Sequence, residues 1–380
     1  MWHLVLLIAC AVAIYLSCEW FVNAVEWLGS RLNVGKMAVG TILAAFGTAL
    51  PESVVTLVAV TTGRTPEAKD IGVGAAMGGP LALATVAYAA TGVALLLKRR
   101  RQRKDQAAPA AAVAVPAGTA GAAAGRSGVA AADGQGRGEA LSDLAEAARL
   151  AKDQRWFLAV FVFKVALGLV AFAFKPALGL VFFATYAVYF WREMRGGPDV
   201  PAAEGVAGHG GHGGDDEDVL EPLKLQPRRA SPAGWAVVVQ TLAALVVIFF
   251  ASQLFVHQLD AIGPMIGLPA AVTALLLSPI ATELPETMNA IIWVRQGKTK
   301  LALANISGAM MIQATVPSGL GLLFTAWKFD AALIWSGAMT MVAIVYLLVT
   351  LRARKFTPMR LAFAGLFYLV FALGLVPILT

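Results

Sequence analysis

The stretch AFGTALPESVV at residues 45–55 lies inside a segment that is long and apolar enough to cross a membrane. A proline and a glutamate near the middle of such a segment are costly. Proline removes a backbone hydrogen bond, and an ionised carboxylate at the centre of a bilayer costs roughly 2.5–3.5 kcal/mol. A chain tolerates these groups where they face protein, water or an ion. Glu52 is therefore a candidate site residue.

A second copy of this stretch lies 234 residues downstream. GTALPES (47–53) aligns with ATELPET (281–287), which places Glu52 on Glu286. A four-residue deletion extends the match, so that GGPLALATV in the first half aligns with GAMMIQATV in the second. One proline–glutamate pair would be chance. Two pairs in register, each followed by a matching segment, indicate an internal repeat.

The composition is that of a polytopic membrane protein. The 380 residues are 58% hydrophobic and only 14% charged, whereas soluble domains carry about 25% charged residues. The net charge of +7 comes from basic residues at the ends of apolar segments. Membrane lipid is thus an expected partner, nucleic acid is not, and homo-oligomerisation is left open. The two cysteines, Cys10 and Cys18, are predicted to be buried free thiols on one helix.

Ten segments are long and apolar enough to span a bilayer, for which about 20 residues suffice. They are residues 4–29, 37–62, 71–97, 156–174, 177–193, 234–257, 269–294, 300–326, 331–351 and 359–379. Each half has five helices, an odd number, so the two halves insert with opposite orientation. The predicted fold is an all-α polytopic membrane protein with ten transmembrane helices in two five-helix inverted-topology repeats.

The chain divides at two polar linkers. We expect residues 1–97 to form the first three helices of the first repeat, with its motif at 40–86. A linker at 98–155 and two helices at 156–194 follow. A flexible linker at 195–233 then leads to the second repeat at 234–380, with its motif at 274–316. Within the first linker, residues from 98 to about 138 are predicted to be disordered, and residues 139–156 are predicted to form an amphipathic helix. Both linkers and most basic loops fall on one side, which the positive-inside rule makes cytoplasmic. Both termini are then extracytoplasmic, in the cell (inner) membrane, and the first apolar run is a retained helix.

Inverted repeats with helices interrupted near mid-membrane are typical of secondary transporters, whose site lies between the repeats. Pro51 and Pro285 are predicted to supply the interruptions and to free backbone carbonyls. Glu52 and Glu286 then approach each other from opposite sides. Two carboxylates with several carbonyls make an all-oxygen site, which suits a hard divalent cation such as Ca²⁺.

These residues resemble the cation/calcium exchanger superfamily, sodium/calcium exchanger branch. GTILAAFGTALPES (40–53) is similar to its first repeat motif, and SPIATELPET (278–287) with ALANISGAMMIQ (302–313) to its second. The resemblance implies a ten-helix fold that exchanges Ca²⁺ for Na⁺ or H⁺. It implies no cofactor and makes the protein a transporter and not an enzyme. The candidate metal ligands are Glu52, Glu286, Thr48, Thr282, Glu283, Ala45 and Gln313.

Departures from the family pattern concern the counter-ion. The residue after the motif threonine is usually serine in the family, but it is Ala49 in one half and Glu283 in the other. Side chains of the family's sodium sites are also largely missing from the third and eighth helices. Glu283 lies three residues before Glu286, and carboxylates so close cannot all ionise cheaply. Proton-coupled exchange is therefore as plausible as sodium coupling.

Other interpretations stay open. The paired glutamates could cap half-helices or pair with Lys164, a residue for which snorkelling to the interface is the default. Glu19 could line a cation path, and Glu26 is expected to be solvated. Asn305 is predicted to form an interhelical hydrogen bond. A proton-coupled exchanger of another cation and a cation channel are the alternative functions, while motifs of hydrolases and nucleotide-binding enzymes are lacking.

Overall fold

The computed structural model describes residues 2–34, 38–62, 66–110, 129–171, 174–195, 220–265, 276, 278–352 and 357–379, and these are almost entirely helical. The first half contains α1 (Trp2–Arg31), η1 (Val39–Ala44), α3 (Ala45–Thr62), α4 (Pro66–Ala82), η2 (Leu83–Ala87), α5 (Tyr88–Ala110), α6 (Val129–Leu169), η3 (Pro176–Leu178) and α7 (Gly179–Arg195). The second contains α8 (Gly234–Met265), α10 (Ser278–Thr282), α11 (Leu284–Gln296), α12 (Thr299–Phe324), α13 (Ala331–Arg352), α14 (Pro358–Phe363) and α15 (Gly365–Leu379).

Each of the ten predicted segments overlaps one or more of these helices. By length and composition, six of the described helices could cross a membrane. The six run over Trp2–Arg31, Gly72–Gln102, Gly234–Phe255, Thr299–Phe324, Ala331–Arg352 and Pro358–Ile378. The chain is therefore a helical protein with several membrane-spanning candidates, and the count of ten spans stays a prediction.

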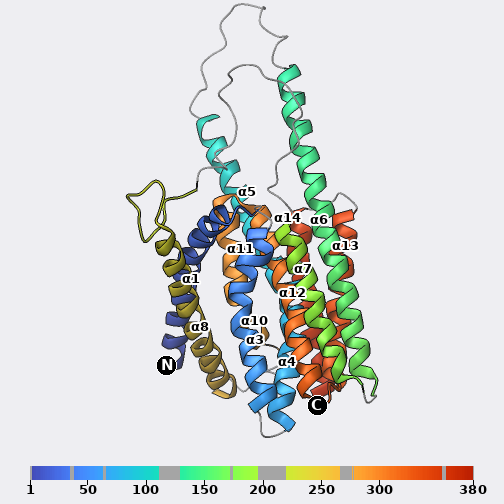
Figure 1. Ribbon diagram of the computed structural model, residues 1–380. Coiled ribbons are helices and arrows are strands. Elements are labelled where there is room, and N and C mark those ends of the chain that lie inside the picture. The colour runs from blue at the N-terminus through green and yellow to red at the C-terminus, as the bar shows by residue number, and fades with distance from the viewer. Residues whose placement is uncertain are drawn as a thin grey trace, which may run out of the picture.

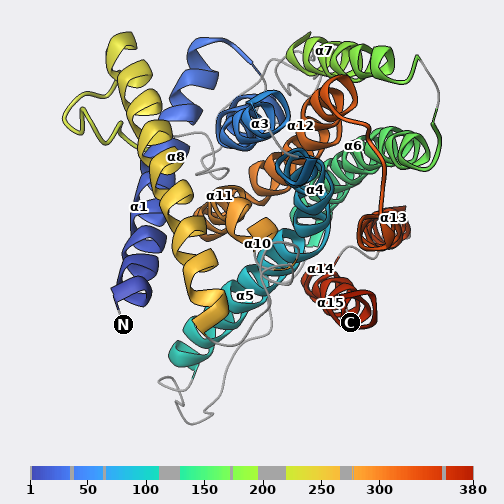
Figure 2. The same cartoon turned by 90° about the horizontal axis from the view of Figure 1, so that it is seen from below.

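Helix α12 is the centre of the bundle. It packs against α3, α4, α6, α7 and α11, which surround it when the bundle is viewed along its length (Figure 2). Small residues permit this close packing. A Cβ on Gly308 would lie 2.1 Å from the carbonyl oxygen of Thr41, and a Cβ on Gly40 would lie 2.7 Å from the Cβ of Ala304 and 3.0 Å from the carbonyl oxygen of Leu301. The two repeat motifs thus touch backbone to backbone.

Helices α1 and α8 lie side by side along one flank of the bundle (Figure 1). Residues 220–233, which we call the strap, run across the end of α1 and the start of α8. The predicted flexible linker at 195–233 is wrong for this part, because the strap is ordered and its Leu223 is fully buried. The histidine- and aspartate-rich stretch of the linker lies outside the described residues.

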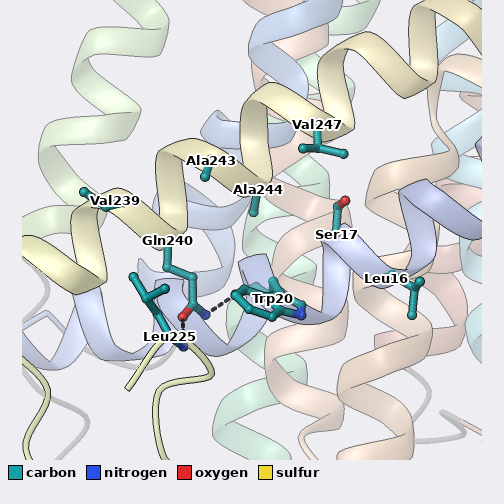
Figure 3. Close-up of a pocket in the computed structure, with 9 residues that line it drawn as sticks. All are labelled: Leu16, Ser17, Trp20, Leu225, Val239, Gln240, Ala243, Ala244 and Val247. Carbon is teal, nitrogen blue, oxygen red and sulfur yellow. Dashed lines mark hydrogen bonds between the residues drawn. The ribbon is translucent and has the colours of Figure 1, made fainter. Parts of the chain in front are cut away.

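Two amides hold the strap. The Nδ2 atom of Asn23 donates to the carbonyls of Glu221 and Pro222, and its Oδ1 atom accepts from the backbone N–H of Lys224. Gln240 on α8 accepts from the N–H of Leu225 and donates to Trp20 on α1, as Figure 3 shows beside a shallow apolar pocket of about 250 Å³. The backbone of the strap finds partners in side chains because it forms no regular secondary structure.

Two acidic residues of α1 are paired. Glu26 was expected to be solvated, but it is 8% exposed and accepts hydrogen bonds from Lys298 at 2.5 Å and from the Trp293 ring at 2.8 Å. Burial forces this pairing, because an unpaired buried carboxylate is costly. Glu19 forms an ion pair with Lys224 of the strap at 3.3 Å. The pair assigns Glu19 to the packing of the strap.

The long linker between α5 and α6 is partly helical. Helix α5 continues to Ala110 and α6 begins at Val129, so the disorder predicted for residues up to 138 is wrong for both flanks. The predicted amphipathic helix and the following span form one continuous helix, α6. In Figure 1 these extensions rise from one end of the bundle, and both chain ends lie at the other.

Candidate cation site

The second repeat motif contains a true helix break. Helix α10 ends at Thr282, Glu283 adopts φ −87° and ψ 7°, and α11 begins at Leu284 with Pro285 in its first turn. The first motif differs, because α3 runs without interruption from Ala45 to Thr62. The predicted break at Pro51 is therefore wrong. The irregularity lies earlier, in the π-helical turn η1, and such turns occur frequently at functional sites.

Gln313 joins the two repeats at the centre of the site. Its Nε2 atom donates to Glu52 Oε2 at 3.0 Å and to Glu283 Oε1 at 2.5 Å. All three side chains are buried, although they come from α3, the α10–α11 break and α12. The fold thus brings together residues that are 261 positions apart in the chain.

The motif threonines and glutamates are paired crosswise between the repeats. Glu52 of the first repeat has Thr282 and Glu283 as polar neighbours, and Glu286 of the second has Thr48. Both hydroxyls also bond to their own helices, Thr48 to the carbonyl of Ala44 and Thr282 to that of Pro279. The structure therefore places Glu52, Glu283, Glu286 and both threonines in one polar cluster.

Glycines of α4 form the wall of this cluster. A Cβ on Gly79 would lie 2.4 Å from Gln313 Oε1 and 2.7 Å from Glu283 Oε1, and a Cβ on Gly78 would lie 2.6 Å from Pro279. Side chains at these two positions would occupy the space beside the carboxylates. Gly79 therefore borders the site itself.

Several buried oxygens in and around the cluster have no hydrogen-bond donor. They are Glu283 Oε2, Glu286 Oε2, Gln313 Oε1, Asn289 Oδ1 and Asn305 Oδ1. Buried acceptors without partners are rare in folded proteins, and a bound cation or proton would satisfy them. Oxygen donors of this kind suit a hard cation.

Asn289 was missed by the sequence interpretation. It is fully buried on α11, and neither atom of its amide has a partner. Its spacing from Glu286 was the available signal, because residues three apart share one helix face. The first repeat has Val55 at the matching position, so the repeat comparison did not point to it.

The carboxylates do not form a ready metal cage. No group of three His, Cys, Asp or Glu side chains within the described ranges is arranged to hold a metal ion. The amide nitrogen of Gln313 lies between Glu52 and Glu283, and a donor group there repels a cation. If this amide turned, its oxygen would face the same space.

The remaining predicted residues lie near the site. Ala45 is fully buried and packs in the main apolar core; a ligand role for its carbonyl stays a prediction. Asn305 donates to the carbonyl of Glu286 at 3.1 Å, which is the predicted interhelical bond. Cys18 of α1 contacts the carbonyl of Pro285, so α1 packs directly against the broken helix.

Lys164 does not snorkel, and it pairs with no carboxylate among the residues that the structure describes. It is fully buried on α6, and its Nζ donates to the carbonyl of Ala76 on α4 at 2.7 Å. In a regular helix this carbonyl accepts from the N–H of residue 80, but residue 80 is proline and has none. Lys164 therefore supplies the missing donor three residues before Gly79.

The sequence pattern of the family described as sodium/calcium exchanger protein matches residues 2–194 and 236–378, which is most of the chain. The chain belongs to the sodium/calcium exchanger protein family. The match covers both repeats and omits the second linker, since residues 195–235 lie outside it. Membership makes the protein an integral membrane transporter of cations. No curated protein is similar enough to serve as a relative.

Solved structures of the sodium-calcium exchanger NCX_Mj have the same fold. One, soaked with Na⁺ and without Ca²⁺, is 15% identical, with a TM-score of 0.64 over 97% of both chains. A second structure, soaked without Na⁺ and Ca²⁺, is also 15% identical, with a TM-score of 0.65 over 98% of both chains. At this identity the likeness shows the fold alone, and the residues of the site must be argued from this chain.

Proposed function

We propose that the protein is a secondary active cation antiporter that moves Ca²⁺ across the membrane in exchange for Na⁺ or H⁺ by alternating access. Glu52 and Glu286 are the central cation-binding carboxylates. Thr48, Thr282, Ala45 and Gln313 supply further oxygens. The geometry adds Asn289 to this set. The proposal includes ten spans in two inverted repeats, with the linkers cytoplasmic and both termini outside.

The observation that supports this function best is the cluster joined by Gln313. Glu52 and Glu283 arrive from different repeats and bond to the same amide. A site that joins two repeats can face either side of the membrane when the repeats move against each other. Helices α1 and α8 pack more extensively on each other than on the rest of the bundle, so they are the natural moving unit.

H⁺ is favoured over Na⁺ as the counter-ion. Glu283 has both Glu52 and Glu286 as charged neighbours, and none of the three pairs with a lysine or arginine within the described part of the chain. Three like charges so close cannot all stay ionised without a cation. When a divalent cation leaves, protons would therefore neutralise the carboxylates. Glu283 is the carboxyl group that has no counterpart in the first repeat, where Ala49 occupies its position.

Radioactive Ca²⁺ uptake into proteoliposomes tests the proposal. Uptake driven by a pH gradient should fall at least tenfold in Glu52→Gln and in Glu286→Gln, because each removes a charged ligand. Glu221→Gln, at an exposed acidic residue of the strap, is the matched control and should transport normally. Normal transport by both site variants would refute the site.

The counter-ion is resolved by a second comparison in the same vesicles. Transport that persists without Na⁺ and stops when the pH gradient collapses supports proton exchange. Transport that needs Na⁺ and ignores the pH gradient supports the sodium alternative. Ca²⁺ flux that does not saturate and needs no counter-ion would identify a channel and refute exchange.

A further inference from the structure

A second buried carboxyl group lies away from the candidate cation site. Asp153 is on α6, in the part of the helix that precedes the predicted span. Its side chain is 1% exposed, and neither carboxylate oxygen has a hydrogen-bond partner. An ionised carboxylate in this environment would cost several kcal/mol. Nothing in the proposed exchange mechanism uses this residue.

The surroundings of Asp153 are polar but provide no donor to it. Tyr88 on α5 and Tyr189 on α7 lie close enough to interact electrostatically with Asp153. Gln154 donates its amide to the Tyr88 hydroxyl at 2.7 Å, while the Gln154 oxygen and the Tyr189 hydroxyl have no partners. Side chains of α5, α6 and α7 therefore form one polar cluster. A proton on Asp153 would give this cluster a further hydrogen-bond donor.

The nearest negative charge makes ionisation harder. Glu193 on α7 is buried and bonds to Arg149 at 2.8 Å, with Arg192 3.8 Å away. Burial, and then repulsion by Glu193, raises the pKa of Asp153 to about 7, against the weaker opposing effects of Arg149, Arg192 and Lys152. Among the described residues, Glu193, Arg149, Arg192 and Lys152 are the charged groups that affect this pKa.

We propose that Asp153 is a proton-binding site at the junction of α5, α6 and α7, separate from the cluster around Gln313. Uptake of one proton from the adjacent aqueous phase, which our orientation makes the cytoplasm, converts the carboxylate into a neutral carboxyl. No other reactant takes part. The proposal does not depend on the identity of the transported cation.

The position of Asp153 connects it with the transport machinery. The same helix carries Lys164, which holds the carbonyl of Ala76 on α4, and Gly79 of α4 borders Glu283. Loss of the proton places a charge between α6 and α7, which water can stabilise only if these helices separate. Cytoplasmic pH is thereby coupled to the support of the cation site.

Infrared spectroscopy of the purified protein tests the site without measuring transport. The wild type should show a protonated-carboxyl C=O band that titrates between about pH 6 and 8. Asp153→Asn should remove that band, whereas Glu283→Gln should leave it. Glu193→Gln should move its midpoint to lower pH and Arg192→Gln to higher pH, because they remove charges of opposite sign.

The outcomes are decisive even if one variant folds poorly. Opposite shifts in Glu193→Gln and Arg192→Gln support the site without Asp153→Asn. A spectrum with no titrating band that depends on Asp153, or a carboxylate that responds to added Ca²⁺ or Na⁺ and not to pH, would overturn the proposal. Where transport is measurable, Asp153→Asn should weaken its response to cytoplasmic pH in this range when the pH gradient is held constant.

Discussion

Lys164 Nζ donates a hydrogen bond to the carbonyl oxygen of Ala76 at 2.7 Å, across the α4–α6 interface. This carbonyl lacks its helical donor because residue 80 is proline. Lys164, a charged residue inside a predicted membrane span, thus donates the hydrogen bond that Pro80 on another helix cannot donate. The pair fixes the part of α4 that borders the candidate cation site.

Replacement of Lys164 by methionine should destabilise the protein by about 1–3 kcal/mol, because the Ala76 carbonyl then stays unsatisfied. Pro80→Ala restores an N–H at residue 80, so the double variant should recover most of this loss. Thermal unfolding of both single variants and the double variant measures the coupling. Strictly additive effects would show that the two residues act separately.

Gly79→Ala should weaken cation binding about tenfold or more, because its Cβ displaces the Gln313 and Glu283 side chains. Gly74→Ala is the matched control on the same helix, since no atom lies within 4 Å of its Cβ. The KM for Ca²⁺ uptake should rise only in Gly79→Ala. Equal KM values in the two variants would show that α4 does not border the binding site.

Loss of the Glu26 carboxylate should destabilise the contact between α1 and the turn that joins α11 to α12. Glu26→Gln leaves the partly buried Lys298 without its counter-charge, at a cost of about 1–3 kcal/mol. The thermal midpoint should drop in this variant and should not change in Glu221→Gln. A smaller loss in the Glu26→Leu, Lys298→Met double variant would confirm that the unpaired charge is the cause.

Release of the strap should make its backbone accessible. Asn23→Leu removes the side chain that bonds to three strap residues, so trypsin should cleave after Lys224 several-fold faster than in the wild type. Trp27→Phe removes one bond, to Glu221, and should give a smaller increase. Equal cleavage rates in all three proteins would mean that the strap is held by other contacts.

Stability should fall as pH rises towards 7. The pKa of Asp153 is raised from 3.8 to about 7, so between these values the folded state binds more protons than the unfolded state. Its contribution is therefore greatest below pH 4 and is lost as pH approaches 7, about 4 kcal/mol in all. Unfolding measured in detergent at pH 5 and pH 8 should show this loss in the wild type and a smaller one in Asp153→Asn.

Part of the site could be predicted because it is encoded locally and repeated. The offset between Glu52 and Glu286 identified both carboxylates, and the extra charge of Glu283 stood out against Ala49. Asn289 could not be found in this way, because Val55 occupies its place in the other repeat. The break predicted at Pro51 failed because a proline removes one bond without having to end its helix.

The sequence by itself determined the membrane class, the helical segments, the repeat and the carboxylates, since these follow from apolar length and from patterns close along the chain. Only the tertiary structure decided the partners: Gln313 between Glu52 and Glu283, Lys164 on Ala76, Lys298 on Glu26, and the strap on Asn23. The reason is physical. A buried polar group must find a partner, and which one it finds depends on how distant helices pack.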